Sequence, residues 1–184
     1  MTTTRREPQL WTIGHSTKPI EDFLAMLRSH GIQRLVDVRT IPRSRHNPQY
    51  DTEALAAHLK KAKLTYRHMP QLGGLKKAKK DSVNAGWKNA SFRGYADYMQ
   101  SEQFRSALEQ LMAESREWAT AVMCAEAVPW RCHRSLIADA LLIRGWVIRH
   151  IMTKTKADTH RLTPFAVVAA DRITYPSASP SVES

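Results

Sequence analysis

The sequence predicts a single α/β domain, a Rossmann-like three-layer sandwich with a mainly parallel open sheet of about five strands and helices on both faces. Three observations support this fold class. Short apolar segments typical of strands alternate with longer segments of helical periodicity. The chain has 184 residues, of which 42% are hydrophobic, which suits one core and is short for two. Neighbouring parallel strands also require crossovers, which the helical segments would supply.

The first two elements are a strand and a helix. Residues 10–16 (LWTIGHS) form a short apolar run of the kind found in buried strands. A helix is predicted over residues 19–31, with Ser16 or Thr17 as its N-cap and Gly31 at its C-terminal end.

The middle of the chain continues the alternation. Residues 34–41 (RLVDVRTI) and 64–70 (LTYRHMP) have the composition of strands, and residues 52–64 between them have helical periodicity. A lysine-rich loop follows. The apolar side chains of residues 95–118 then suit one face of a single long helix.

The last part of the chain predicts a second strand, helix and strand unit. Residues 120–126 (TAVMCAE) and 146–152 (WVIRHIM) are apolar strands on either side of a helix at residues 133–145. We expect residues 165–175 (FAVVAADRITY) to add an edge strand.

Both ends of the chain are poor in apolar residues. Residues 1–8 and the serine-rich residues 176–184 cannot bury enough surface to order themselves, so we expect the folded domain to span residues 9–175. No apolar run is long enough to span a bilayer, and the N-terminus lacks the apolar middle of a secretory signal. The sequence therefore predicts a cytoplasmic protein without a membrane partner.

Positive charge is concentrated in one stretch. The formal net charge is +11, and residues 60–93 contain ten lysines and arginines with the single acid Asp81. Such a concentration of positive charge attracts polyanions, of which nucleic acid is the most common. The aromatic residues Trp87 and Phe92, which lie among these cations, can stack on bases. The alternative is a solubilising surface. The expected nucleic-acid surface comprises Lys76, Lys77, Lys79, Lys80 and Lys88.

Polar side chains that could bind a ligand or take part in a reaction follow the predicted strands. In open parallel sheets ligands bind beyond the carboxyl ends of the strands, so we expect these side chains to meet. After the first strand, Gly14 permits a tight turn, and the free N–H groups of the following helix attract anions. His15 has either a functional role, in which it binds the ligand or acts as an acid or base, or a structural role, in which it only makes a hydrogen bond within the protein. Ser16 either caps the helix or contacts the anion.

The second strand carries an aspartate followed by arginines. Asp37 and Arg39 either form a structural ion pair, or Asp37 orients an arginine while Arg39, Arg43 and Arg45 grip phosphate or carboxylate. Asn47 lies in the same loop and is expected to contact the ligand.

The stretch CAEAVPWRCHRS, residues 124–135, is the densest in reactive side chains. In a closed apolar pocket Glu126 could have a raised proton affinity and act as an acid or base. Pairing with Arg131 or Arg134 would instead keep it ionised. One sequence leaves both options open.

Three interpretations compete for the cysteines. Cys124 could be the nucleophile of a phosphatase-like loop closed by Arg131, although the six residues between them are one more than that loop has. Cys124 and Cys132 could ligate zinc or iron with His133 and His15. They could also be buried apolar residues. Cys132, near a helix start and between arginines, is the better thiolate.

The stretch Arg93–Gly94–Tyr95 precedes an apolar helical face. Arg93 resembles another anion contact at a helix entry. Tyr95 either packs in the core or reaches the ligand.

Five motifs carry a resemblance to a known family. TIGHS, VDVRTIPRSRHNPQ, YRHMPQLGG, FRGYADYM and CAEAVPWRCHRSLIADAL, in this order over about residues 10–151, resemble the prokaryotic family catalogued as domain of unknown function 488. The resemblance implies an α/β fold with a parallel sheet. It does not imply any particular reaction. The residues that match its motifs are His15, Ser16, Asp37, Arg39, Arg45, Asn47, Gly73, Gly74, Arg93, Gly94, Tyr95, Cys124, Glu126, Cys132, His133 and Arg134.

These observations favour an enzyme that acts on nucleic acid, DNA above all, or on a nucleotide. We expect hydrolysis of an N-glycosidic bond, as in DNA repair, with Glu126 or Asp37 activating water and His15 binding or protonating the leaving base. Trp130 would stack on the base. The residues expected to hold the substrate are Ser16, Arg39, Arg43, Arg45, Asn47, Arg93, Tyr95, Trp130, His133 and Arg134.

Two alternatives remain at this point. One is a cysteine-dependent transferase or redox enzyme for a small anionic substrate, with Cys132 or Cys124 as nucleophile. The other is a non-catalytic nucleic-acid-binding module. No cofactor is predicted, apart from the zinc or iron option at the cysteines and histidines.

Overall fold

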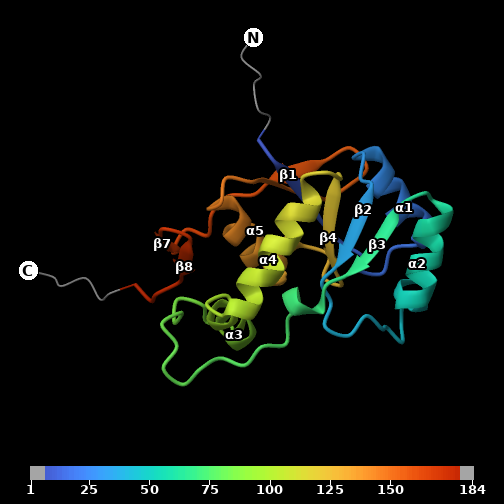
Figure 1. The fold of residues 1–184 in the computed structure, drawn as a ribbon. Helices are drawn as coiled ribbons and strands as arrows, with labels where there is room; N and C mark the ends of the chain where they lie inside the picture. Colours follow the sequence, from blue (N-terminus) through green and yellow to red (C-terminus); the bar gives the residue numbers. More distant parts are fainter. Residues whose placement is uncertain (1–6, 179–184) are drawn as a thin grey trace, which may run out of the picture.

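The computed structural model describes residues 7–178 and has one α/β domain (Figure 1). The strands of its main sheet are β1 (Gln9–Gly14), β2 (Arg34–Asp37), β3 (Thr65–His68), β4 (Thr120–Cys124), β5 (Val147–Ile151) and β6 (Ala157–Thr159). Their order in the sheet is β3-β2-β4-β1-β5-β6. The first five strands are mutually parallel, and β6 pairs antiparallel with β5. The predicted fold class is therefore confirmed, with one strand added at an edge.

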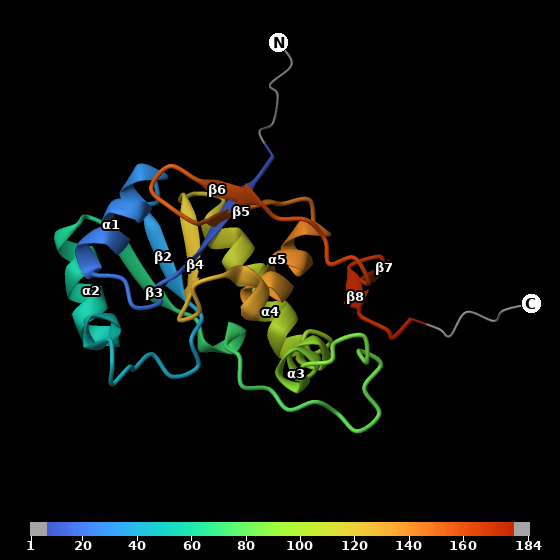
Figure 2. The ribbon, with the colours of Figure 1, turned by 180° about the vertical axis from the view of Figure 1, so that it is seen from behind.

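Helices cover both faces of this sheet. They are α1 (Ile20–Ser29), α2 (Thr52–Lys61), α3 (Ala90–Tyr98), α4 (Glu102–Ser115) and α5 (Arg134–Leu142), with short 3-10 helices η1 (Pro48–Tyr50), η2 (Pro70–Leu72) and η3 (Pro129–Arg131). Helices α1 and α2 lie on one face, and α4 and α5 on the other (Figures 1 and 2). Each face has its own hydrophobic core, around Phe23 and Leu27 on the first and around Leu108 and Leu136 on the second. No helix within residues 7–178 is long and apolar enough to cross a membrane.

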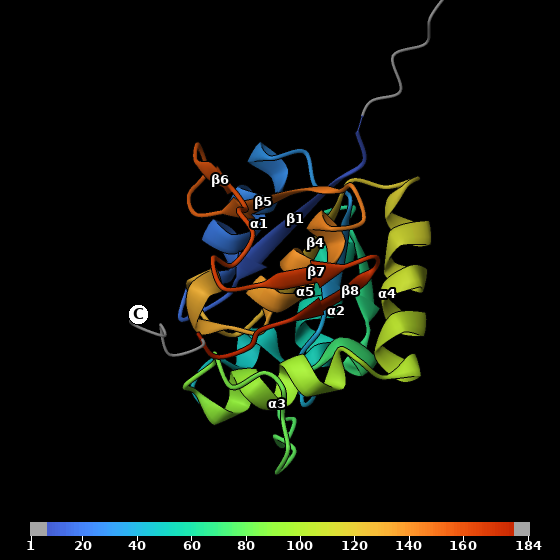
Figure 3. The same cartoon turned by 90° about the vertical axis from the view of Figure 1, so that its left-hand side faces the viewer.

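The single helix predicted over residues 95–118 is wrong, because two helices occupy this region. Helix α3 begins earlier, at Ala90, where the Asn89 side chain accepts hydrogen bonds from the backbone N–H groups of Ser91 and Phe92. A second cap starts α4, where Ser101 accepts from the N–H of Phe104 at 3.2 Å. The two helices run in clearly different directions in Figure 3. The sequence signal for this break was the serine within the apolar periodicity.

The predicted cap of the first helix is also wrong. Pro19 takes the N-cap position of α1, and no side chain caps it. Ser16 instead has a left-handed backbone, with φ of 47°, and its N–H donates to the carbonyl of Ala125 at 2.9 Å. The turn after β1 is therefore built around the loop that follows β4. Few non-glycine residues adopt this conformation, and they concentrate at functional sites.

The second strand ends earlier than the predicted residues 34–41. Strand β2 stops at Asp37, because the N–H of Arg39 donates to the Asp37 side chain at 3.1 Å instead of continuing the ladder. The edge strand predicted for residues 165–175 is a separate hairpin, β7 (Val167–Ala169) with β8 (Arg172–Thr174), whose two strands lie side by side in Figure 3. The edge of the main sheet is β6.

The predicted disorder of the termini concerns residues that lie mostly outside the described ones, which leave out residues 1–6 and 179–184. Next to these limits the chain is held at both ends. The carbonyl of Pro8 accepts from the N–H of Val147 at 2.9 Å, and Tyr175 is fully buried.

The topology of the sheet defines where a ligand site should be. The chain leaves β1 through α1 toward β2, whereas it leaves the neighbouring β4 through α5 toward β5, on the opposite side. Strands β1 and β4 therefore form a topological switch point, and ligands of open α/β sheets bind at the carboxyl ends of such strands.

Candidate functional site

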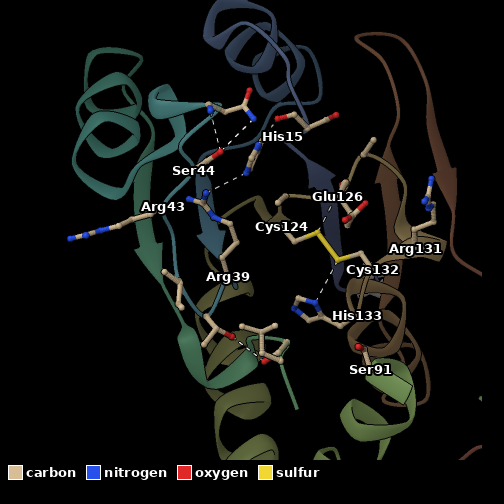
Figure 4. Close-up of a pocket in the computed structure, with 18 of the residues that line it drawn as sticks. His15, Arg39, Arg43, Ser44, Ser91, Cys124, Glu126, Arg131, Cys132 and His133 are labelled. Carbon is tan, nitrogen blue, oxygen red and sulfur yellow. Dashed lines mark hydrogen bonds between the residues drawn. A yellow bond between two sulfur atoms is a disulfide. The ribbon is translucent and has the colours of Figure 1, made fainter. Parts of the chain in front are cut away.

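A cavity of about 780 Å³ opens at the carboxyl ends of β1, β2 and β4 (Figure 4). We call it the main cavity. Sequence reasoning placed the site at this edge, and the following residues that it selected line the main cavity: His15, Ser16, Arg39, Arg43, Asn47, Tyr95, Cys124, Glu126, Cys132 and His133. It missed Ser44, Leu75 and Ser91, which also line the cavity.

The loop after β4, residues 125–133, crosses directly over the end of β1. A Cβ atom on Gly14 would collide with the backbone carbonyl of Glu126, so only glycine allows this crossing. The N–H of His15 donates to the carbonyl of Cys124 at 3.0 Å. Gly14 therefore serves the approach of two protein segments, in addition to the turn predicted from the sequence.

Arg134 does not enter the main cavity, so its predicted role in holding phosphate is wrong. The side chain is buried, with 1% exposure, and its Nη2 donates to the carbonyl of Glu126 at 2.7 Å. Its Nη1 donates to the hydroxyl of Thr12 at 3.3 Å. Burial lowers the pKa of Arg134 to about 10, against the opposing influence of the Glu126 charge. Arg134 thus ties the 125–133 loop to strand β1.

A chain of hydrogen bonds continues from Arg134 across the sheet. The hydroxyl of Thr12 lies 2.7 Å from Nδ1 of His150, and Nε2 of His150 lies 2.9 Å from Nδ1 of His160. Nε2 of His160 donates to Asp139 at 2.7 Å. Burial lowers the pKa of His150 to about 3, with further lowering by His160 and Arg134. The hydrogen bonds thus run without a break from Arg134 to Asp139.

Sequence reasoning missed this network, because its members come from four separate elements. One local signal existed. Asp139 is an acid within the apolar helix segment LIADALL, and it is fully buried. A buried carboxylate requires partners, which Thr163 and Tyr175 supply together with His160.

Asp37 is the partner of Arg39 and takes no part in lining the main cavity. It is fully buried, accepts from Nε of Arg39 at 2.9 Å and from Nη2 at 2.7 Å, and accepts from the Tyr66 hydroxyl at 2.9 Å. Asp37 therefore forms the predicted ion pair and orients Arg39, which lines the main cavity. Its predicted role as a water-activating base is wrong, because the carboxylate is fully buried and does not line the cavity. Arg39 also donates to the carbonyl of Tyr50, which aims its Nη1 toward His15.

His15 is a buried, neutral imidazole at the edge of the cavity. Its Nδ1 donates to the carbonyl of Ser16 at 2.8 Å, its Nε2 accepts from Nη1 of Arg39 at 3.3 Å, and its ring stacks on Tyr50. Burial lowers its pKa to about 4, and the positive charges of Arg39 and Lys18 act in the same direction. At neutral pH His15 therefore has no spare proton, so protonation of a leaving base by His15 is disfavoured.

Glu126 is the one carboxylate among the described residues that line the main cavity. It lies in the exposed part of the 125–133 loop, with Arg131 on the same loop and with Arg39 and Arg43 across the cavity (Figure 4). The cavity thus has an excess of positive charge around a single acid. Such a lining suits an anionic ligand.

The two cysteines meet at the floor of the cavity, where the structure joins Cys124 and Cys132 as a disulfide (Figure 4). The free Cys132 thiolate predicted from the sequence therefore belongs to the reduced protein. Nδ1 of His133 lies 3.6 Å from Sγ of Cys132. Within residues 7–178, no group of three or more His, Cys, Asp or Glu side chains is arranged to hold a metal ion.

His133 and Tyr95 form the wall below the disulfide. Their rings are 4.9 Å apart, and Nε2 of His133 has no hydrogen-bond partner. Burial lowers the pKa of His133 to about 4, with Arg134 adding to the effect. Tyr95 belongs mainly to the core, since it is 1% exposed and its hydroxyl donates to the carbonyl of Leu72.

Besides Arg134, three residues expected to hold the substrate lie outside the main cavity. Arg45 is exposed in the loop after β2, and Arg93 donates to the carbonyl of Lys88 at 3.3 Å. Trp130 is 64% exposed and lines a different cavity. The neighbouring Gly94 serves packing, because a Cβ atom there would collide with the backbone around Lys76.

The lysine loop, residues 75–88, borders the main cavity through Leu75. Asp97 holds this loop by accepting from the N–H of Lys79, the hydroxyl of Ser82 and the side-chain amide of Asn84. Lys76 lies over the ring of Tyr98, whereas the other lysines are exposed: Lys77, Lys79, Lys80 and Lys88. The basic surface is thus built on a fixed loop next to the cavity.

Comparison with known families gives one result. The model described as "Domain of unknown function DUF488" matches residues 19–141. The chain belongs to the DUF488 family. In this DUF488 protein the matched part spans the Asp37–Arg39 pair and the entire 125–133 loop, and it begins just after the TIGHS motif. A search of curated proteins found no match, and a search of solved structures found none either.

Proposed function

We propose that this DUF488 protein is a hydrolase that binds a nucleotide, free or within a nucleic acid strand, in the main cavity and cleaves its N-glycosidic bond. One observation carries the proposal. Glu126 is the one acid lining this cavity within the described residues, and Arg39, Arg43 and Arg131 line the same cavity. Arginines grip phosphate, and a positioned carboxylate activates water.

The arginines divide into two kinds. Arg39 is neutralised by its ion pair with Asp37, so its role is to position His15. Arg43 and Arg131 are exposed and have no acidic partner within 4.0 Å among the described residues, so they are free to contact phosphate. The volume of about 780 Å³ falls in the usual range of ligand sites, roughly 300–1,000 Å³.

The base would lie against the inner wall of the cavity. Phe92 and the edge of Tyr95 supply aromatic surface there. The ring of His133 packs beside Tyr95 and lines the same wall.

The reaction needs a single water molecule and a single carboxylate. Glu126 accepts a proton from the water while the water oxygen bonds to C1′ of the sugar. The bond between C1′ and the base nitrogen breaks, and its electron pair stays on the base. The base then takes a proton from solvent, since neutral His15 has none to give. The products are the free base and a sugar with a hydroxyl at C1′.

Base release tests this proposal. The reduced protein is incubated with a panel of nucleosides, nucleotides and oligonucleotides that carry modified bases, and free base is measured. Glu126→Gln should bind substrate but release about 10²-fold less base or none. Glu102→Gln, which changes an acid with 79% side-chain exposure in α4, is the control and should react normally. Equal release by Glu126→Gln and the unmodified protein would overturn the proposal.

A second candidate function rests on the cysteines. The contact of Cys132 with His133, beside Cys124, suits thiol–disulfide exchange with an anionic disulfide substrate. The reduced Cys132 attacks one substrate sulfur, which breaks the substrate disulfide, releases the first substrate thiol and leaves a mixed disulfide. Cys124 then attacks Sγ of Cys132. This releases the second substrate thiol and leaves the protein disulfide.

Alkylation separates the two candidates. Iodoacetamide treatment of the reduced protein should abolish the thiol activity, as should Cys132→Ser, whereas Glu126→Gln should leave it intact. Salt-dependent nucleic-acid binding without any product would instead indicate a non-catalytic binding module.

A further inference from the structure

A second cavity, of about 460 Å³, lies on the other side of η3. We call it the side cavity. Its apolar wall comprises Trp130, Pro129, Trp87, Phe165 and Pro164. Two of these side chains are well exposed for aromatic residues, Trp130 at 64% and Phe165 at 38%.

The two cavities share their dividing walls. On η3, Arg131 lines the main cavity while the adjacent Trp130 lines the side cavity. On the opposite wall, Phe92 lines the main cavity and Trp87 the side cavity, and their rings stack with centroids 4.8 Å apart. The two cavities therefore border the same pair of features, the short helix η3 and the stacked pair of Phe92 and Trp87.

We infer that the side cavity is a nucleobase subsite, and that the ligand of this protein is a single-stranded oligonucleotide whose neighbouring nucleotide occupies the main cavity. The inference rests on the proposed function in that it takes the main cavity to hold a nucleotide. It adds the substrate class, because a free nucleotide would leave the side cavity empty.

The alternation of cation and aromatic side chains matches the chemistry of such a strand. In single-stranded nucleic acid each base is followed by a phosphate, and proteins bind it by stacking aromatic side chains on bases while cations contact the backbone. Trp130 and Arg131 present this pair at adjacent positions of η3.

The charges around the side cavity fit the same ligand. Arg161 lines it as a second cation. Its one acid within the described residues, Asp158, lies 3.5 Å from Nζ of Lys156 and is thereby balanced. An oligonucleotide, whose backbone is anionic, therefore meets no uncompensated negative charge at this subsite.

Binding of oligonucleotides of increasing length tests the inference. Affinities of the reduced protein are measured by fluorescence anisotropy for a labelled mononucleotide, dinucleotide and tetranucleotide, and for longer single strands. We expect the tetranucleotide to bind at least about tenfold more tightly than the mononucleotide, because it fills both cavities.

Trp130→Ala and its control make the test specific. Trp130→Ala should weaken tetranucleotide binding about tenfold and leave mononucleotide binding unchanged. Trp118→Ala removes another exposed tryptophan, 41% exposed, that lines neither cavity, and it should have no effect. Circular dichroism confirms that both variants are folded.

The outcomes separate the subsite from the catalytic proposal. Equal affinity for mononucleotide and tetranucleotide, an unchanged affinity of Trp130→Ala, or no binding of any strand would overturn the inference. Length-dependent binding through Trp130 without release of base would support the inference and contradict the proposed hydrolysis. Base release from free nucleotides alone would support hydrolysis and contradict the subsite.

Discussion

The backbone carbonyl of Glu126 accepts a 2.7 Å hydrogen bond from Nη2 of Arg134, a buried side chain at the start of α5. The same guanidinium contacts Thr12, and through it the buried chain of His150, His160 and Asp139. The backbone that carries the proposed catalytic carboxylate is therefore anchored from within the core.

Replacement of Arg134 should destabilise the protein. Arg134→Met leaves the carbonyl of Glu126 and the hydroxyl of Thr12 without their donor, so we expect the free energy of unfolding to fall by about 1–3 kcal/mol. Urea denaturation measures this change. Arg131→Met, which alters an exposed arginine three residues earlier, should change stability by less than about 0.5 kcal/mol. Equal stability of the two variants would contradict the assigned role of Arg134.

Acid should destabilise the fold through its buried histidines. The pKa values of His15 and His133 are lowered to about 4 and that of His150 to about 3, from an ordinary value of 6.5. Between pH 6.5 and 4 the unfolded chain binds protons that the folded protein does not. The stabilisation is therefore complete above pH 6.5 and is lost as the pH falls toward 4, by about 1–2 kcal/mol for each histidine at pH 5.

Urea denaturation at pH 7 and at pH 5 measures the loss. His150→Gln removes one of the three groups, so its difference in stability between the two pH values should be smaller than that of the unmodified protein. His46→Gln, at an exposed loop position, should behave like the unmodified protein. A free energy of unfolding that is the same at both pH values would refute this explanation.

The crossing of β1 and the 125–133 loop should not tolerate a side chain at Gly14. In Gly14→Ala the new methyl group collides with the carbonyl of Glu126, so one of the two segments must move. We expect a loss of about 2 kcal/mol or more and a lower affinity for any ligand of the main cavity. Gly31→Asn is the control, since Gly31 has a left-handed φ of 69° with open space around it, and asparagine tolerates that conformation. A normal melting temperature and normal ligand affinity of Gly14→Ala would show that the crossing is not tight.

The lysine loop should contribute affinity for nucleic acid without contributing to folding. Reversal of the exposed lysines Lys77, Lys79, Lys80 and Lys88 to glutamate should weaken binding at low salt and flatten its salt dependence. The melting temperature should change little, because exposed charges contribute little to stability. The matched control reverses four exposed lysines that line neither cavity: Lys60, Lys61, Lys63 and Lys154. An equal loss of affinity in both variants would mean that total charge matters and the loop does not.

The location of the site could be predicted from the sequence, because it follows from the parallel sheet. Once the strands that end in Gly14, Asp37 and Cys124 are parallel, the residues after them must meet at one edge. The Asp37–Arg39 pair was likewise visible as one of two alternatives, since a carboxylate in an apolar strand needs a partner.

Other features depend on three-dimensional relations that local sequence does not contain. Trp130 and Arg131 are adjacent in the chain, yet η3 directs them into different cavities. Arg134 looked like a ligand-binding residue because its neighbours are, and only the packing of α5 on β1 shows that it faces inward. The pairing of His150 with His160 depends on how β5 is followed by β6 at the sheet edge.

Single-turnover base release, compared side by side for the unmodified protein, Glu126→Gln and Cys132→Ser, tests the central claim most directly. All three are assayed reduced, on the same modified single-stranded oligonucleotides. The hydrolase account predicts free base from the unmodified protein and from Cys132→Ser, with little or none from Glu126→Gln despite retained binding. Base release that survives in Glu126→Gln, or the absence of free base from every tightly bound oligonucleotide, would contradict it.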